Sequence, residues 1–149
     1  MDRVRLHSSD VGLGVLAASS GVQVLMTPLF KDYAPSLSLK AIDPLLGLIL
    51  AVFITMGGIQ AVTGVLWMGR RISTGWVLEQ VGWLFVAAGW IGYALLVAYT
   101  FPFSTIGYTM AFSIGVIAAF RAYVVWTIER SVRPRAEVAK TLRQDRGTE

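Results

Sequence analysis

Two charged residues, Glu79 and Arg121, lie inside long apolar stretches of the chain and are the residues best placed to do chemistry. A charge at the centre of a bilayer costs about 2.5–3.5 kcal/mol on insertion scales, so such residues usually pair or have a function. Counted along consecutive helices, the two lie at depths that differ by only several ångström, because a helix rises about 1.5 Å per residue. The arginine stem can close that gap. We therefore predict a Glu79–Arg121 ion pair inside a helix bundle.

This predicted pair has two interpretations. It could be a proton or ion relay, or a gate. It could instead be a structural latch that fixes the register of two helices. In another structural arrangement, the charged side chains snorkel toward the interface and Arg70 or Arg71 pairs with Glu79. The residues alone favour a structural role. The spans also contain three glutamines that could line a polar interior or form interhelical hydrogen bonds: Gln23, Gln60 and Gln80.

Four apolar stretches must position these residues. A bilayer core requires a helix of about 20 mostly apolar residues, and each stretch reaches that length. The chain is 55% hydrophobic and only 15% charged, whereas soluble domains are about 25% charged. We predict an all-α polytopic membrane protein. Residues 1–130 form one domain, in which four transmembrane helices pack as an antiparallel bundle, and residues 131–149 form a basic cytoplasmic tail. The predicted spans are Val11–Phe30, Leu45–Met68, Trp76–Tyr99 and Thr105–Ile128.

Local signals set the expected ends of these helices. Ser8, Ser9 and Asp10 are good N-cap residues for a first helix that starts at Val11. Asp43 and Pro44 form an N-cap followed by a proline at the first helical position. We expect Pro134 to end the helix of the fourth span before the tail. The tail itself is expected to form a short amphipathic helix or to be disordered.

The distribution of basic residues predicts the orientation. With four spans, the two termini and the loop between spans two and three share one side. The basic residues on the other side are only Lys31 and Lys40. The positive-inside rule therefore places both termini in the cytoplasm of a bacterial cell. The predicted cytoplasmic anchors of the bundle are Arg70, Arg71, Arg130, Arg133 and Arg135.

A ridge of small residues runs along the fourth span at every fourth position. Small residues let helix backbones approach closely, which is the main packing device in lipid. For the ridge, packing within the monomer is favoured, and the alternative is association of copies through it. We expect the protein as a whole to be a homo-oligomer in the lipid bilayer. The ridge consists of Gly107, Ala111, Gly115 and Ala119.

Three tryptophans recur at seven-residue spacing along the third span: Trp76, Trp83 and Trp90. This spacing places them on one helix face. Packing or contact with lipid is the favoured role, and stacking on a ligand is the alternative.

Several function classes lack support. The chain has no cysteine and one histidine, His7, so no thiolate or histidine-based metal site is expected. No nucleophile–base set, phosphate loop or metalloprotease motif is present, so we expect no catalytic residues and no cofactor. The basic residues flank spans, where anionic lipid explains them, so we expect no nucleic-acid partner.

The segment Gly75-Trp76-Val77-Leu78-Glu79-Gln80-Val81-Gly82, with the Ala/Gly-rich spans and basic tail, resembles small four-span membrane proteins of bacteriophages that infect high-GC Gram-positive bacteria. Some of those proteins are considered holins. The resemblance implies a non-enzymatic protein that assembles laterally in the membrane. One alternative is a small transporter or ion pathway built on Glu79 and Arg121. Another is an accessory subunit whose tail recruits a protein partner. Small multidrug exporters also have four spans, but their buried glutamate lies in the first.

Overall fold

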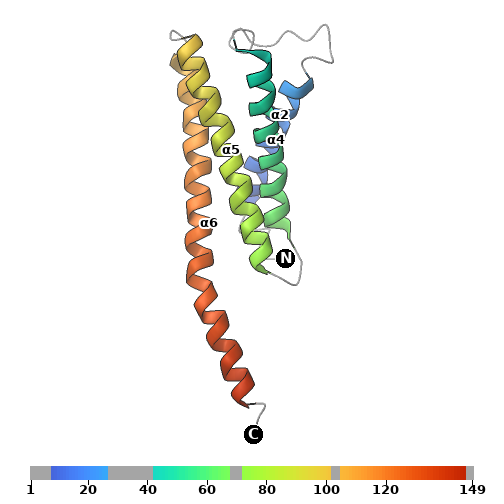
Figure 1. Cartoon of the computed structure of the whole chain (residues 1–149), viewed down its shortest axis with the longest axis vertical. Coiled ribbons are helices and arrows are strands. Elements are labelled where there is room, and N and C mark those ends of the chain that lie inside the picture. The colour runs from blue at the N-terminus through green and yellow to red at the C-terminus, as the bar shows by residue number, and fades with distance from the viewer. Residues whose placement is uncertain (1–7, 27–41, 68–71, 102–104, 147–149) are drawn as a thin grey trace.

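The structure, a computed structural model, describes residues 8–26, 42–67, 72–101 and 105–146, with side chains except at 72–73 and 132–146. Within these residues the fold is four α-helices and no strand (Figure 1). All four are long and apolar enough to cross a membrane, which confirms the predicted all-α membrane bundle. The helices are α2 (Ser8–Met26), α4 (Pro44–Leu66), α5 (Ile72–Thr100) and α6 (Thr105–Arg146).

Helix α4 begins as its sequence predicts. The Asp43 side chain accepts hydrogen bonds from the backbone N–H groups of Leu45, at 2.9 Å, and Leu46, at 3.3 Å. Pro44 occupies the first helical turn, where its missing N–H would have had no partner in the helix. A capping carboxylate and a proline together fix the start of α4.

Helix α2 begins earlier than its capping signals predict. Its first residue is Ser8 rather than Val11, so Asp10 lies inside the first turn and does not cap the helix. The Asp10 carboxylate is instead engaged by Arg121 of α6. In the bond to Arg121 both partners are charged, whereas in a cap only the carboxylate is, which favours the tertiary contact.

Helix α6 corrects a second prediction, because it continues through Pro134 to Arg146. Proline removes one backbone hydrogen bond and crowds the preceding turn, which bends a helix without always ending it. Figure 1 shows α6 changing direction below the bundle and standing clear of the other helices. The segment after the proline is rich in Ala, Glu, Lys, Leu and Arg. These residues have high helix propensity and maintain the helix.

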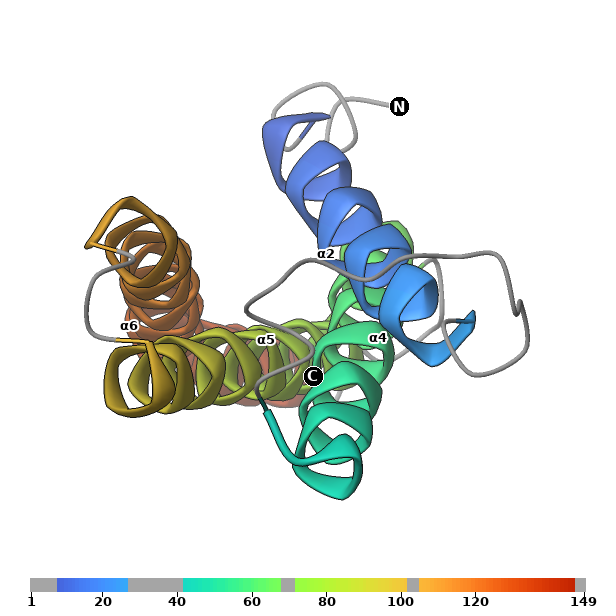
Figure 2. The same cartoon turned by 90° about the horizontal axis from the view of Figure 1, so that it is seen from above.

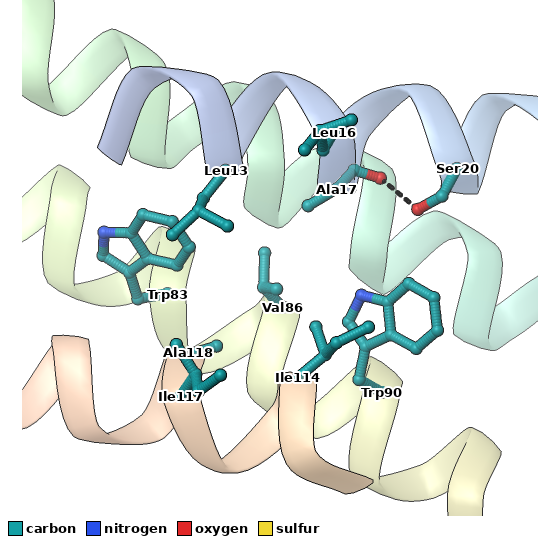
Figure 3. A pocket seen from close by; sticks show the side chains of 10 residues that line it. All are labelled: Leu13, Leu16, Ala17, Ser20, Trp83, Val86, Trp90, Ile114, Ile117 and Ala118. Atoms are coloured by element: carbon teal, nitrogen blue, oxygen red, sulfur yellow. Dashed lines mark hydrogen bonds between the residues drawn. The ribbon is translucent and has the colours of Figure 1, made fainter. Parts of the chain in front are cut away.

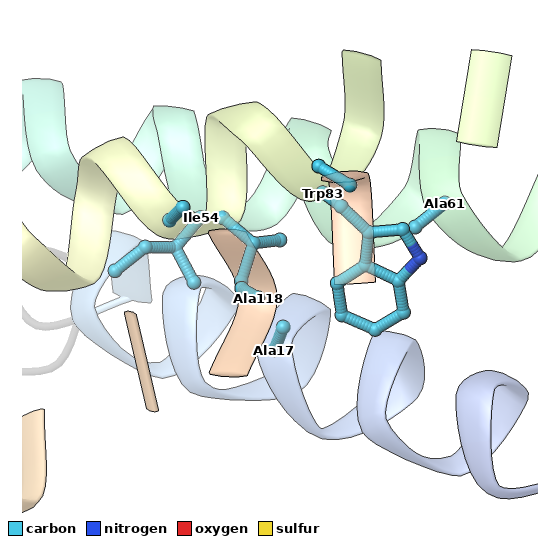
Figure 4. Packing of buried hydrophobic residues seen from close by; sticks show 8 residues of the cluster. Ala17, Ile54, Ala61, Trp83 and Ala118 are labelled. Carbon is cyan, nitrogen blue, oxygen red and sulfur yellow. The ribbon is translucent and has the colours of Figure 1, made fainter. Parts of the chain in front are cut away.

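The helices pack in series rather than as a closed square. Helix α4 packs between α2 and α5, and α5 packs between α4 and α6 (Figure 2). The buried cluster that joins them combines small side chains such as Ala17, Ala61 and Ala118 with Ile54 and Trp83 (Figure 4). The bundle is therefore open between α2 and α6, with α5 behind the opening.

Glycines on α4 and α5 let α4 approach its two neighbours closely. A Cβ built on Gly58 would lie 2.6 Å from the backbone N of Ala18 in α2, and one on Gly82 of α5 would lie 2.4 Å from that of Ala61. Real Cβ atoms do not approach backbone atoms so closely. Backbone contact of this kind is how membrane helices gain packing energy when lipid is as apolar as their side chains.

Candidate functional site

Arg121 joins two carboxylates from different helices. Its Nη2 atom donates to Asp10 Oδ2 and to Glu79 Oε1, the second at 3.4 Å. The three residues come from α2, α5 and α6, and we call them the charged cluster. The structure thus brings together the predicted Glu79 and Arg121, and adds an acid from the first helix.

The charged cluster is largely hidden from the surface of the bundle. Glu79 is 3% exposed and Asp10 8%, and the Arg121 side chain is 21% exposed. Charges in such surroundings attract strongly, and the attraction offsets the cost of removing them from water. The cluster consists of two carboxylates and one guanidinium. Helix α4 contributes no charged residue between Pro44 and Leu66.

Gly64 of α4 determines where the Glu79 backbone can lie. A Cβ on Gly64 would fall 2.4 Å from the backbone N and 2.7 Å from the Cα of Glu79. Any larger residue would push α5 away from α4 at the level of the charged cluster. The signal for this contact in the sequence is the helical spacing of Gly57, Ala61 and Gly64.

Sequence reasoning missed Asp10 because its position suggested a cap. A second signal was available. Asp10, Gly14, Ala17 and Gly21 share one face of α2, and these four residues are the buried ones of that helix. An acid at the head of a small-residue face points into the bundle and therefore requires a partner there.

The small-residue ridge of the fourth span faces α5 of the same chain. Ala111 and Gly115 are buried, Ala119 is half-buried and Gly107 is exposed. A Cβ on Gly115 would lie 2.6 Å from Ile91 Cγ1. An oligomer would therefore have to associate through a different surface.

The remaining predicted residues are dispersed. Gln23 is exposed near the end of α2, whereas Gln80 is half-buried near the start of α5, so they share no polar interior. The Oε1 atom of Gln60 is buried with no hydrogen-bond partner among the described residues.

Of the predicted cytoplasmic anchors, Arg130 lies 4.2 Å from the centroid of the Trp126 ring, a cation–π contact. Arg133 and Arg135 lie in α6, where the side chains are not described. Arg70 and Arg71 lie outside the described residues.

An apolar cavity of about 320 Å³ adjoins the charged cluster, between α2, α5 and α6 (Figure 3). Its nearest lining residues are Leu13, Trp83 and Ala118. Each lies three or four residues from a member of the cluster, a rise of about 4.5–6 Å along the helix. The cavity therefore starts one helical turn from the charges in all three helices.

Two tryptophans of the predicted stripe line this cavity, and Trp76 does not. Trp83 is 3% exposed and belongs to the buried cluster, while Trp90 is half-buried. Figure 3 shows the indole nitrogen of Trp90 turned toward the interior of the cavity. Neither indole nitrogen has a hydrogen-bond partner among the described residues.

No protein-family model, curated protein or solved structure matches the chain. In the part of the chain that the structure describes, no group of three or more His, Cys, Asp or Glu residues could hold a metal ion. The fold defines the class, an integral membrane protein with four candidate spans. The charged cluster and its adjoining cavity supply the basis for a function.

Proposed function

We propose that the chain is a non-enzymatic transport protein of the bacterial cytoplasmic membrane, in which Asp10 and Glu79 take up and release a proton in competition with Arg121. The observation that carries the proposal is the single Arg121 Nη2 atom shared by two buried carboxylates. A latch between two helices needs one acid and one base. The additional acid is a group that can take up a proton while Arg121 keeps its bond to the other acid.

The cost of burial supports this function over a purely structural one. Intramembrane acids are rare, and they mark ion pathways and proton relays. Here two acids are buried within reach of one arginine, on three separate helices. Arg121 lies within hydrogen-bond distance of both carboxylates. Glu129 and Arg130 lie two turns further along α6.

The first prediction measures proton flux in liposomes containing the purified full-length chain. A potassium diffusion potential, set with valinomycin, drives protons toward an entrapped pH-sensitive dye. We expect flux above that of protein-free liposomes, and at least a tenfold reduction in Asp10→Asn and in Glu79→Gln. The matched control is Asp43→Asn, because asparagine also caps helices and Asp43 lies at the exposed start of α4. Wild-type flux equal to that of protein-free liposomes would refute the proposal.

The same liposomes separate the other two candidate functions. A holin-like lesion would release a large entrapped dye such as carboxyfluorescein, and neutralising either acid would not prevent that release. An accessory subunit would give neither proton flux nor dye release. Proton flux that both acid variants retain in full would show that the charged cluster is structural.

A further inference from the structure

The cavity between α2, α5 and α6 lies at the depth of the bilayer mid-plane. Ala17 and Ala118 are the middle residues of the first and fourth candidate spans, and both line the cavity. Val86, which also lines it, is next to the middle residue of the third candidate span. A bilayer core is about 30 Å thick, so the polar groups of the lipids lie about 15 Å away on either side. What reaches the cavity from the membrane is therefore hydrocarbon.

The lining of the cavity also suits hydrocarbon. No charged residue lines it, and the Ser20 hydroxyl already donates to the Ala17 carbonyl at 2.8 Å. The indole nitrogens of Trp83 and Trp90 are buried. A charged or strongly polar guest would lose its hydration and gain little from this lining in return. An uncharged apolar guest would lose nothing and would pack against the two aromatic rings.

The cavity opens sideways, between α2 and α6. Figure 3 shows these two helices on opposite sides of the cavity, and Figure 2 shows them apart at the edge of the bundle. Leu16 of α2 and Ile117 of α6 line the cavity and are also exposed. At mid-plane depth such exposure is to acyl chains and not to water. A guest can therefore enter from the lipid without crossing either surface of the membrane.

The size of the cavity accommodates a segment of a hydrocarbon chain. Apolar cavities of about 150 Å³ stay dry and take up benzene, and this cavity has a volume of about 320 Å³. Water is thus a poor occupant. The hydrocarbon at hand in a membrane is the end of a phospholipid acyl chain, because the chains of the two leaflets meet at the mid-plane.

We propose that this cavity binds the terminal segment of a phospholipid acyl chain, which enters between α2 and α6 and packs against Trp83 and Trp90. The partner is thus a lipid of the surrounding membrane, which completes the bundle where its own helices leave a gap. The inference does not rest on the proposed function, since no charged residue lines the cavity.

The test is photocrosslinking in liposomes that contain the purified full-length chain. The probe is a phosphatidylcholine with a diazirine near the end of one acyl chain, and peptide mass spectrometry locates the adducts. Val86 and Ile54 are a matched pair, because both are buried aliphatic residues next to the middle of a candidate span and only Val86 lines the cavity. Met56, exposed at the same depth of α4, reports that the probe reaches the mid-plane. We expect adducts at Met56 and Val86, with Val86 labelled at least tenfold more than Ile54.

A matched pair of variants tests the entrance. Ile117 lines the cavity and is 56% exposed, while Val116, beside it on α6, is 46% exposed and lies outside the lining. Ile117→Trp should reduce the adducts at Val86 at least tenfold by filling the opening, and Val116→Trp should leave them unchanged. Thermal unfolding checks that both variants are folded, and the comparison of Val86 with Ile54 in the wild type decides the question if Ile117→Trp is not.

Four outcomes would overturn the inference. Labelling of Met56 without Val86 would mean that no acyl chain enters the cavity. Equal labelling of Val86 and Ile54 would mean that the probe reacts throughout the bundle, and equal labelling of Val86 in the two tryptophan variants would place the entrance elsewhere. If a second copy of the chain fills the opening, light scattering would show a dimer that Ile117→Trp dissociates, with Val86 unlabelled. Proton flux is measured separately, so each of these results leaves the proposed function as it stands.

Discussion

At the residue scale, Arg121 is the centre of the charged cluster because it contacts both acids. Removing Arg121 leaves two carboxylates close together in a buried site without the guanidinium that bonds to both. Removing one acid leaves Arg121 paired with the other. The members therefore contribute unequally, which a simple two-residue pair would not do.

This asymmetry gives a stability prediction. Arg121→Gln should destabilise the bundle more than Asp10→Asn or Glu79→Gln, because breaking a buried pair costs about 3–5 kcal/mol when a charge is left uncompensated. The double variant Arg121→Gln/Glu79→Gln should lose less than the sum of its single changes, with a coupling of about 0.5–3 kcal/mol. Denaturation of the purified chain in mild detergent, followed by tryptophan fluorescence, measures these differences. Strict additivity would mean that the two residues do not interact.

At the element scale, close contact between helix backbones determines where the charged side chains meet. Gly64 allows α5 to lie against α4 at Glu79, while Gly115 allows α6 to lie against α5 at Ile91. The positions of α5 and α6 relative to α4 thus depend on residues that carry no functional group. Small residues on two helices are as much a part of the site as its charges.

Gly64→Ala tests this dependence. The added Cβ would collide with the Glu79 backbone, and overpacking of this kind costs about 1–3 kcal/mol. Gly47→Ala in the same helix is the matched control, since a Cβ there meets nothing within 4 Å and alanine favours the helix. We expect Gly64→Ala to lower both the unfolding midpoint and proton flux, and Gly47→Ala to lower neither. Equal midpoints and flux in the two variants would contradict the positioning role of Gly64.

At the scale of the whole molecule, the open arrangement of the helices matters most. Helices α2 and α6 meet through the Asp10–Arg121 bond at one end and are separated by the cavity beyond it. The continuous helix α6 then extends past the bundle to Arg146. The orientation of this assembly in the membrane follows from the basic residues and is a separate prediction.

Because the chain has no cysteine, single cysteines can report its orientation. Ser131 is exposed near the end of the membrane part of α6, and Thr105 is exposed at its start. With both termini in the cytoplasm, Thr105→Cys should react with an impermeant maleimide on intact spheroplasts, and Ser131→Cys only after permeabilisation. The reverse pattern would place the termini outside, and labelling of both residues from outside would contradict a span between them.

The sequence by itself determined the class of fold. Length and apolarity of four segments are enough to predict four helices, because lipid leaves the backbone no other way to satisfy its hydrogen bonds. The Asp43–Pro44 start of α4 was also predictable, since a cap depends on residues adjacent in the chain. The Glu79–Arg121 pair followed from depth along two consecutive helices.

Only the tertiary structure decided the membership of the site. The residues next to Asp10 in the chain predict that it caps a helix. Its role in the site depends on Arg121 of α6, which is 111 residues further along the chain. The ridge on the fourth span could have faced any helix, because small-residue spacing specifies close packing without naming a partner. The cavity likewise exists because α4 and α5 fix the distance between α2 and α6. Those distances are set by contacts between helices, which no single helix encodes.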